Sequence, residues 1–283
     1  MTHRAILAGV ALGRGLPVAV MGALNVSPES FHPGSVHTES SDLIDAARAM
    51  VDAGAALIDV GARSTAPYGT ATVGDEEERE RLARAVEALN AKIPVPISAD
   101  TTRPGPARAA LDAGAQVIND VSGLRHPEVA ALIRERDAGA ILMAFPGRAP
   151  SGLSAIGSVK ALLQETLGRA REAGIPDERV VLDPGIGFFR GERVSWDEWD
   201  ASVLAGLGEL DSLGRPLCVG VSRKSFLGAI IGRPRTEDRL AGSLAATAVA
   251  VWNGASLVRT HDVIETLDAV RVAERIRRAG GTL

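Results

Sequence analysis

Polar side chains of distinct chemistry recur along the chain, each at or just after the end of a short apolar run. They are Asn25, Asp59, Asp100, Asn119 with Asp120, Asp183, Ser222 with Lys224, and Arg259 with His261, while a further run ends in Met143. Carboxylates, amides and an ammonium group offer many hydrogen-bond donors and acceptors, and one carboxylate can accept two bonds from the edge of a 2-amino-pyrimidinone. The set predicts a cleft for a flat, heteroatom-rich ring rather than for an apolar ligand.

Part of this series suits an anion. Arg259, His261 and Asn25 provide a guanidinium, an imidazolium and an amide, which together can hold phosphate. The sequence contains no His/Cys/Asp cluster with the spacing of a zinc site. The order of its Ser, His and Asp residues supports no catalytic triad.

A repeated junction indicates the elements that position these side chains. An Ala-rich helical segment ends in Ala-Gly-Ala or a similar sequence, and an apolar run follows at once, at Asp52–Asp59, Asp112–Asn119, Asp137–Met143 and Asn253–Arg259. Glycine just past a helix can adopt the left-handed conformation that ends it. The branched residues that follow are typical of a buried parallel strand.

Strand and helix patterns alternate along the chain. The predicted strands are 17–24, 55–61, 95–100, 115–119, 139–144, 179–183, 216–222 and 255–260. The predicted helices are 40–53, 75–91, 104–113, 127–136, 158–173, 199–213, 237–252 and 263–278. The acidic run Asp75–Arg81 is expected to be the solvated start of a helix, with its acids near the positive end of the helix dipole.

Eight alternating strand and helix patterns predict a (β/α)₈ barrel formed by a single domain over residues 1–283. The length is close to the ~250 residues typical of this fold. A doubly wound sheet is the alternative, but no Gly-x-Gly-x-x-Gly follows the first predicted strand. In a barrel the C-terminal strand ends converge on one face, where barrel enzymes do their chemistry.

Composition limits the partners and the compartment. A net charge of −4 gives no reason to expect nucleic acid. The lone Cys218, expected to be buried, fits a reducing compartment, and we expect a cytoplasmic protein. No secretory signal is convincing, and the apolar run Leu244–Trp252 is too short to span a bilayer. The apolar helix that contains it, Leu240–Trp252, is a candidate face for a homodimer.

Seven segments at predicted strand ends resemble dihydropteroate synthases of the pterin-binding barrel superfamily, from about Val20 to Arg277. They are Leu24–Phe31, Ile58–Pro67, Ile97–Thr101, Ile118–Leu124, Leu182–Phe188, Val219–Phe226 and Val258–Asp262. The resemblance implies a transferase that joins an arylamine, 4-aminobenzoate or a relative, to 6-hydroxymethyl-7,8-dihydropterin diphosphate and releases pyrophosphate in folate or pterin biosynthesis.

The resemblance also implies roles for individual residues. Asp100, Asn119, Asp183 and Lys224 would bind the pterin ring. Asn25, Arg259 and His261 would hold the diphosphate, with Mg²⁺ as a counter-ion near Asn25. Ser222, Thr65 and Met143 would complete the substrate site, and Asp100, Lys224 and Arg259 would be the catalytic residues. Two long segments, Val26–Glu39 and Ala62–Asp75, would close over it.

The chain departs from the family's usual motifs in four loops, whose sequences are closer to those of archaeal-type homologues. Ala66 stands where a basic residue is usual, and Arg63 lies three positions earlier. The first loop contains His32-Pro33, the segment Leu142–Gly147 lacks the common Met-His, and Phe188–Gly191 with Trp196–Asp200 replaces the usual sequence there. The pterin-ring residues are intact, so pterin binding is the firmer prediction and the arylamine the less certain one.

Two other functions fit the ring-binding residues. A pterin-dependent methyltransferase acting with a corrinoid protein would use Asp100, Asn119 and Asp183 in the same way. The segment Ser222–Ser225 argues against it, and Arg259 and His261 have an obvious task only when a diphosphate is present. A non-catalytic pterin-binding homologue is the second alternative, for which Ala66 would mark lost chemistry.

Overall fold

The computed structural model describes residues 3–27, 40–63, 73–146, 152–189 and 194–280. Within these ranges eight parallel strands close into a barrel in the order β10-β3-β4-β5-β6-β7-β8-β9. They are β3 (Ala19–Asn25), β4 (Leu57–Gly61), β5 (Ile97–Asp100), β6 (Val117–Asp120), β7 (Gly139–Met143), β8 (Val180–Asp183), β9 (Leu217–Gly220) and β10 (Ala255–Thr260). Each coincides with a predicted strand, so the predicted barrel is confirmed.

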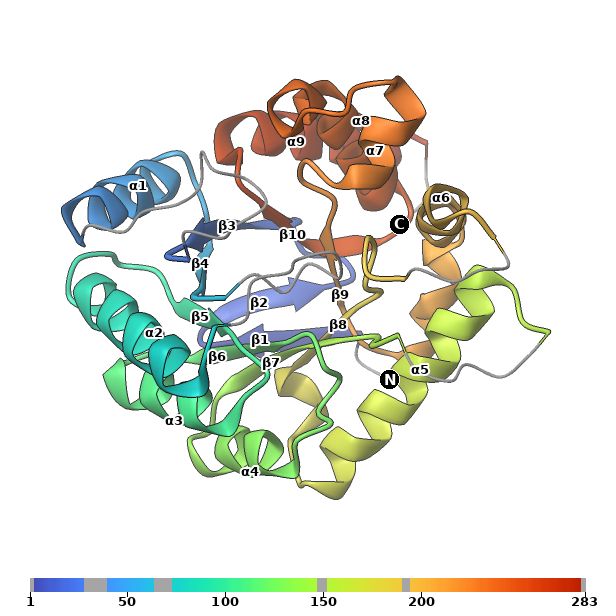
Figure 1. The fold of residues 1–283 in the computed structure, drawn as a ribbon. Helices are drawn as coiled ribbons and strands as arrows, with labels where there is room; N and C mark the ends of the chain where they lie inside the picture. Colours follow the sequence, from blue (N-terminus) through green and yellow to red (C-terminus); the bar gives the residue numbers. More distant parts are fainter. Residues whose placement is uncertain (1–2, 28–39, 64–72, 147–151, 190–193, 281–283) are drawn as a thin grey trace.

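Helices surround the ring of strands (Figure 1). They are α1 (Ser40–Asp52), α2 (Asp75–Asn90), α3 (Pro104–Ala113), α4 (Pro127–Glu135), α5 (Ala155–Glu172), α6 (Trp196–Ala205), α7 (Ser225–Ile231), α8 (Leu240–Trp252) and α9 (Val263–Ala279). The helix predicted over 199–213 is divided into α6 and the 3₁₀ segment η3 (Leu207–Leu213), and another 3₁₀ segment, η4 (Thr236–Arg239), precedes α8. The seven-residue α7 was not predicted, because two turns give too little periodicity to detect.

The predicted helix-to-strand junctions hold at three places and differ at one. Gly54, Gly114 and Gly254 have φ values of +109°, +114° and +104°. At the junction after α4, Asp137 takes the left-handed conformation with φ +57°, and Gly139 already belongs to β7. There the glycine provides space instead, because a Cβ on Gly139 would lie 2.8 Å from Leu7 Cδ2.

Leu7 belongs to an antiparallel hairpin of β1 (Arg4–Leu7) and β2 (Val10–Gly13), which was not predicted. The hairpin lies across the interior of the ring in Figure 1. Its buried side chains pack against residues from the barrel strands, including Met21, Leu57, Val117, Ile141 and Val181. The hairpin therefore closes the N-terminal end of the barrel and leaves the C-terminal face for the site.

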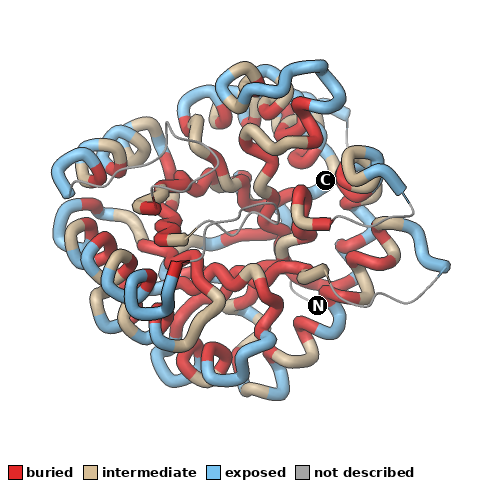
Figure 2. Tube along the Cα trace, viewed as in Figure 1, coloured by how far each residue is buried: buried red, intermediate tan, exposed pale blue. Residues whose placement is uncertain are grey.

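A larger buried cluster fills the space between the strands and the inner faces of the helices. Figure 2 shows this division, with buried strands and exposed outer helix surfaces. Cys218 is buried in the barrel interior, as predicted. Across the described ranges, no helix combines the length and the apolar character needed to cross a membrane.

Candidate active site

Strand register brings the predicted site residues into one row. Asn25 pairs with Gly61, Gly61 with Asp100, and Asp100 with Asn119, so the ends of four neighbouring strands lie level. On the other side of the barrel Met143 pairs with Asp183. Gly61 keeps the row open, since a Cβ there would lie 3.3 Å from Asn25 Oδ1.

Arg259, near the end of β10, reaches across to two carboxylates. Its Nε donates to Asp59 Oδ2 at 2.6 Å and its Nη2 donates to Asp100 Oδ2 at 3.1 Å. Asn119 Nδ2 also donates to Asp59 Oδ2, at 3.1 Å. Arg259 and Asp59 therefore connect the residues predicted to bind the ring with those predicted to bind the anion.

Burial strongly perturbs this cluster. It raises the pKa of Asp100 to about 7, although Arg259 opposes the shift. Burial also disfavours the charge of Arg259, but Asp59 and Asp100 outweigh it and hold its pKa above the ordinary value. The second oxygens of Asp59 and Asp100 are buried and make no hydrogen bond within the described part of the chain. Each therefore has acceptor capacity that the described side chains do not use.

Asp183 and Lys224 form the opposite side of the site. Burial raises the pKa of Asp183, while the Gly185 N–H, which donates to its Oδ1 at 2.7 Å, and the charge of Lys224 oppose that shift. Burial lowers the pKa of Lys224 to about 8, with Asp183 opposing. The Lys224 ammonium lies 4.5 Å from the centre of the Phe188 ring, a cation–π contact that orients it.

The turn after β8 is shaped around Lys224. Gly187 has φ +88°, and a Cβ on it would lie 2.9 Å from Lys224 Cδ. Its N–H donates to Asp200 Oδ1 at 2.8 Å, which ties the turn to α6. Only glycine combines this conformation with such a close approach.

The segments after β9 and β10 are locked together next to Lys224. Arg223, with φ +53°, makes a bidentate pair with Asp262 at 2.9 and 2.7 Å. The N–H of His261 donates to Ser222 Oγ at 3.2 Å, and its Nδ1 lies 3.1 Å from the carbonyl oxygen of Ala23. These bonds fix Ser222, Lys224 and His261 relative to one another.

Met143 and Thr65 are the remaining predicted site residues. Met143 is buried, and its Cγ would lie 3.2 Å from a Cβ on Gly185, so it supports the turn after β8 from below. Thr65 lies outside the described residues, as do Ala66, His32-Pro33 and most of the two segments expected to close over the site.

Two carboxylates that hold other side chains in place, those of Asp59 and Glu78, were not given this role from the sequence. Asp59 was recognised at a strand end but given no role, although it holds both Arg259 and Asn119. Glu78 was expected to be solvated, yet it is fully buried. Thr101 Oγ1 donates to it at 2.6 Å, Arg103 at 2.9 Å and Arg63 at 3.0 Å. Arg63 is thus held beside the end of β5, next to Asp100.

Comparison with known proteins places this geometry in context. The sequence profile of the family described as pterin binding enzyme matches residues 21–261. The dihydropteroate synthase of Escherichia coli strain K12 is 40% identical over 261 residues, which cover 90% of this chain and 90% of that protein.

Solved structures agree over almost the whole chain. A Coxiella burnetii dihydropteroate synthase in complex with pteroic acid matches with a TM-score of 0.86 at 34% identity, covering 98% of this chain and 100% of that one. A Xanthomonas albilineans dihydropteroate synthase in complex with 7,8-dihydropteroate matches with a TM-score of 0.83 at 35% identity, covering 97% and 98%.

Proposed function

The chain belongs to the pterin-binding enzyme family, and we propose that it catalyses the dihydropteroate synthase reaction. An arylamine, 4-aminobenzoate or a relative, displaces the diphosphate of 6-hydroxymethyl-7,8-dihydropterin diphosphate. A C–O bond breaks, a C–N bond forms, the amine loses one proton and pyrophosphate leaves. The observation that carries the proposal is the cluster of Asp100, Asp183, Lys224 and Arg259 at the C-terminal face of the barrel, in which Asp100 is buried and the other three are partly buried.

Asp183 and Lys224 are proposed to bind the pterin ring. The Asp183 carboxylate, already oriented by the Gly185 N–H, has acceptor capacity left for the amino-pyrimidinone edge. Lys224 would donate to ring heteroatoms from its place above Phe188. Asn119 gives its amide hydrogen to Asp59, which leaves its carbonyl oxygen as an acceptor for the ring.

Asp100 and Arg259 are proposed to stabilise opposite charges as the C–O bond breaks. The free oxygen of Asp100 would face the cation that develops at the pterin methylene, and Arg259 would face the departing diphosphate. Asp100 is buried and Arg259 is partly buried, so their fields are less screened than they would be in water. The neutral arylamine then attacks, with no covalent enzyme intermediate.

Mg²⁺ is proposed as the counter-ion of the diphosphate, held by Asn25. Within the described residues there is no cluster of three His, Cys, Asp or Glu side chains suited to a metal. A site with few protein ligands fits Mg²⁺, which is usually bound through few protein oxygens together with substrate phosphates and water. The amide oxygen of Asn25, above Gly61 at the end of β3, is such an oxygen. When bound, Mg²⁺ would neutralise charge on the leaving group.

The arrangement of Arg259 favours the synthase over the two alternatives. A methyltransferase acting with a corrinoid protein releases no diphosphate and needs no buried guanidinium beside the ring-binding carboxylates. A non-catalytic pterin-binding protein would gain nothing from the buried charges on Asp100 and Arg259, which are costly to maintain.

A homodimer is proposed from the surface of α7, α8 and α9. Most of the exposed large apolar side chains of the described residues lie on these neighbouring helices, including Ile230, Val249, Ile264 and Val272. Concentrated apolar surface of this kind marks interaction sites. Cytoplasm is the proposed compartment, supported by the reduced, buried Cys218.

Pyrophosphate release tests the proposed reaction. The protein is incubated with the pterin diphosphate, Mg²⁺ and 4-aminobenzoate, and we expect release that requires the amine. If a panel of arylamines gives none while the pterin still binds, the synthase assignment is wrong and the non-catalytic or methyltransferase reading replaces it.

A further inference from the structure

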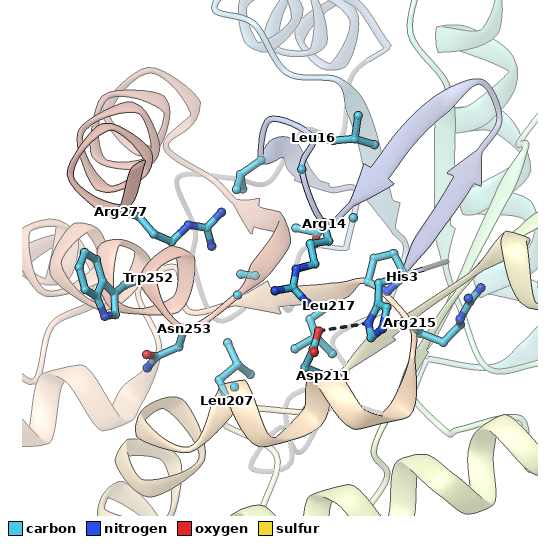
Figure 3. Close-up of a pocket in the computed structure, with 18 residues that line it drawn as sticks. His3, Arg14, Leu16, Leu207, Asp211, Arg215, Leu217, Trp252, Asn253 and Arg277 are labelled. Carbon is cyan, nitrogen blue, oxygen red and sulfur yellow. Dashed lines mark ion pairs between the residues drawn. The ribbon is translucent and has the colours of Figure 1, made fainter. Parts of the chain in front are cut away.

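A second cavity lies at the end of the barrel opposite the candidate active site. It encloses about 580 Å³ and is lined by the first residues of β9 and β10, Leu217 and Ala255. The turn after β2, the segment η3 and the turn between α8 and β10 complete its wall (Figure 3). Its volume falls within the range of about 300–1,000 Å³ that is typical of ligand sites.

The cavity is positively charged although the whole chain carries a net charge of −4. Three arginines and one aspartate line it: Arg14, Arg215, Arg277 and Asp211. Asp211 lies beside His3 on this wall, with 3.2 Å between Asp211 Oδ1 and His3 Nδ1. An anionic ligand would therefore meet an excess of positive charge.

Two of these guanidinium groups have donors to spare. Arg277 donates through Nη1 to the Val251 carbonyl at 2.7 Å, and its buried Nε makes no hydrogen bond among the described residues. The Arg14 side chain makes no hydrogen bond or ion pair within the same part of the chain. Figure 3 shows both groups directed toward the middle of the cavity. A guanidinium has five N–H donors, so both can bind a carboxylate or phosphate.

The rest of the wall combines apolar residues and one aromatic ring with the polar side chains of His3, Asn253 and Ser256. Leu207 and Leu217 are buried, whereas Trp252 is 47% exposed at the edge of the cavity. Tryptophan and arginine side chains both pack well against flat rings.

We propose that this cavity binds a planar aromatic anion of about the size of a mononucleotide. Its ring lies against Trp252 and the leucines, and its phosphate or carboxylate lies between Arg14 and Arg277. The proposal is independent of the reaction proposed for the opposite face, since the two sites share no side chain.

Titration calorimetry on the full-length protein tests the proposal with four probes: AMP, adenosine, inorganic phosphate and 2-naphthoate. We expect AMP or 2-naphthoate to bind at one site per chain, and the tighter of the two identifies the anionic group. Adenosine and phosphate, each of which has half of the required chemistry, should bind at least about tenfold more weakly, a difference of about 1.4 kcal/mol. Binding should change tryptophan fluorescence, and Trp252→Phe should remove that change.

Matched variants locate the bound probe. Arg14→Met and Arg277→Met should each weaken binding at least about tenfold. Arg271→Met, on the same helix α9 but with its side chain 69% exposed and outside the cavity, should stay within about twofold of the wild type. Arg14 is exposed and makes no side-chain bond among the described residues, so its variant should fold even if Arg277→Met does not. Asp183→Asn, at the other face, should leave binding unchanged.

Three results would overturn the proposal. The first is no binding of AMP or 2-naphthoate at millimolar concentration. The second is phosphate binding as tightly as AMP, which would remove the role of the ring. The third is binding that Asp183→Asn abolishes while Arg14→Met leaves it intact, because the probe would then occupy the active site.

Discussion

Arg259 forms ion pairs with both Asp59 and Asp100. Its guanidinium is paired with two buried carboxylates, so the groups proposed to stabilise the transition state also stabilise one another. A diphosphate that binds Arg259 competes with Asp100 for it. Weakening that ion pair raises the pKa of Asp100 and couples the occupancy of the anion-binding side to the protonation of the ring-binding side.

We expect a narrow pH optimum for kcat/KM of the pterin diphosphate. Asp100, with a pKa of about 7, stabilises the cation only when ionised, so activity should rise as the pH passes about 7. Lys224, with a pKa of about 8, donates best as the ammonium, so activity should fall above about 8. Such a bell-shaped profile reports the groups of the free enzyme.

A conservative variant assigns the alkaline side of this profile. Lys224→Arg keeps its charge at high pH and should move the alkaline limb upward by at least one unit, at reduced overall activity. An unmoved limb would mean that another group controls it. Activity that stays constant from about pH 6 to 8 would contradict the assigned state of Asp100.

Asp183→Asn tests the ring-binding carboxylate at nearly constant shape. Loss of one partner of a buried, charged hydrogen bond should weaken pterin binding by about 2 kcal/mol or more, roughly 30-fold in Kd, measured by calorimetry. The control is Asp120→Asn, because Asp120 is also buried at a strand end but accepts from the N–H groups of Ser122 and Leu124 at 2.6 and 3.2 Å. The control should lose unfolding free energy and keep its pterin affinity. Equal Kd changes in the two variants would remove Asp183 from the site.

At this scale the sequence indicates which residues face the site, but not how they pair. Strand ends can be recognised from apolar runs, and this located Asn25, Asp59, Asp100, Asn119 and Asp183. Asp59 and Arg259 are 200 positions apart, and nothing in that spacing tells which carboxylate a guanidinium will contact. The burial of Glu78 was missed for a related reason. An acidic helix start resembles a solvated one until Thr101, Arg63 and Arg103 are known to converge on it.

Among the elements, the turn from Asp183 to Phe188 has the most direct influence on the site. Its backbone bonds Asp183 through Gly185 and lies against Lys224 at Gly187. Gly187→Ala should therefore displace the lysine, lower the affinity for the pterin about tenfold or more, and cost about 1–2 kcal/mol of unfolding free energy because of its positive φ.

Gly152→Ala is the matched control for this turn. Gly152 has the same φ of +88°, but a Cβ there would meet nothing within 4 Å. Both variants should lose comparable stability in chemical denaturation, and only Gly187→Ala should lose affinity. Normal pterin binding by Gly187→Ala would show that Lys224 tolerates the intruding methyl group.

Element prediction succeeded where the repeating β/α pattern is long and failed where segments are short. The β1–β2 hairpin has two strands of four residues and stands outside the β/α repeat that revealed the equally short strands of the barrel. The role of the hairpin depends on tertiary packing, because it can close the end of the barrel only when the barrel strands are in place around it.

For the whole molecule, the surface of α7, α8 and α9 leads to a prediction about assembly. Val272, 59% exposed on α9, should be buried in the dimer, so Val272→Glu should shift the protein toward monomer in sedimentation velocity at micromolar concentration. Leu153→Glu, at a comparably exposed apolar position before α5, should leave the mass unchanged. A wild type that is monomeric at every concentration would exclude the dimer.

The closure of the barrel between β10 and β3 has a consequence for how the enzyme is made. Arg259 pairs with Met21, so the first and last strands of the ring meet across almost the whole chain. During synthesis the edge of β3 therefore stays unpaired until β10 has been made, since this contact is among the most distant in sequence. Asn25 and Arg259, which come from these two strands, cannot meet until then. If Asn25 and Arg259 hold the diphosphate as proposed, a prematurely terminated chain that lacks β10 could fold much of the barrel wall but could not bind the diphosphate.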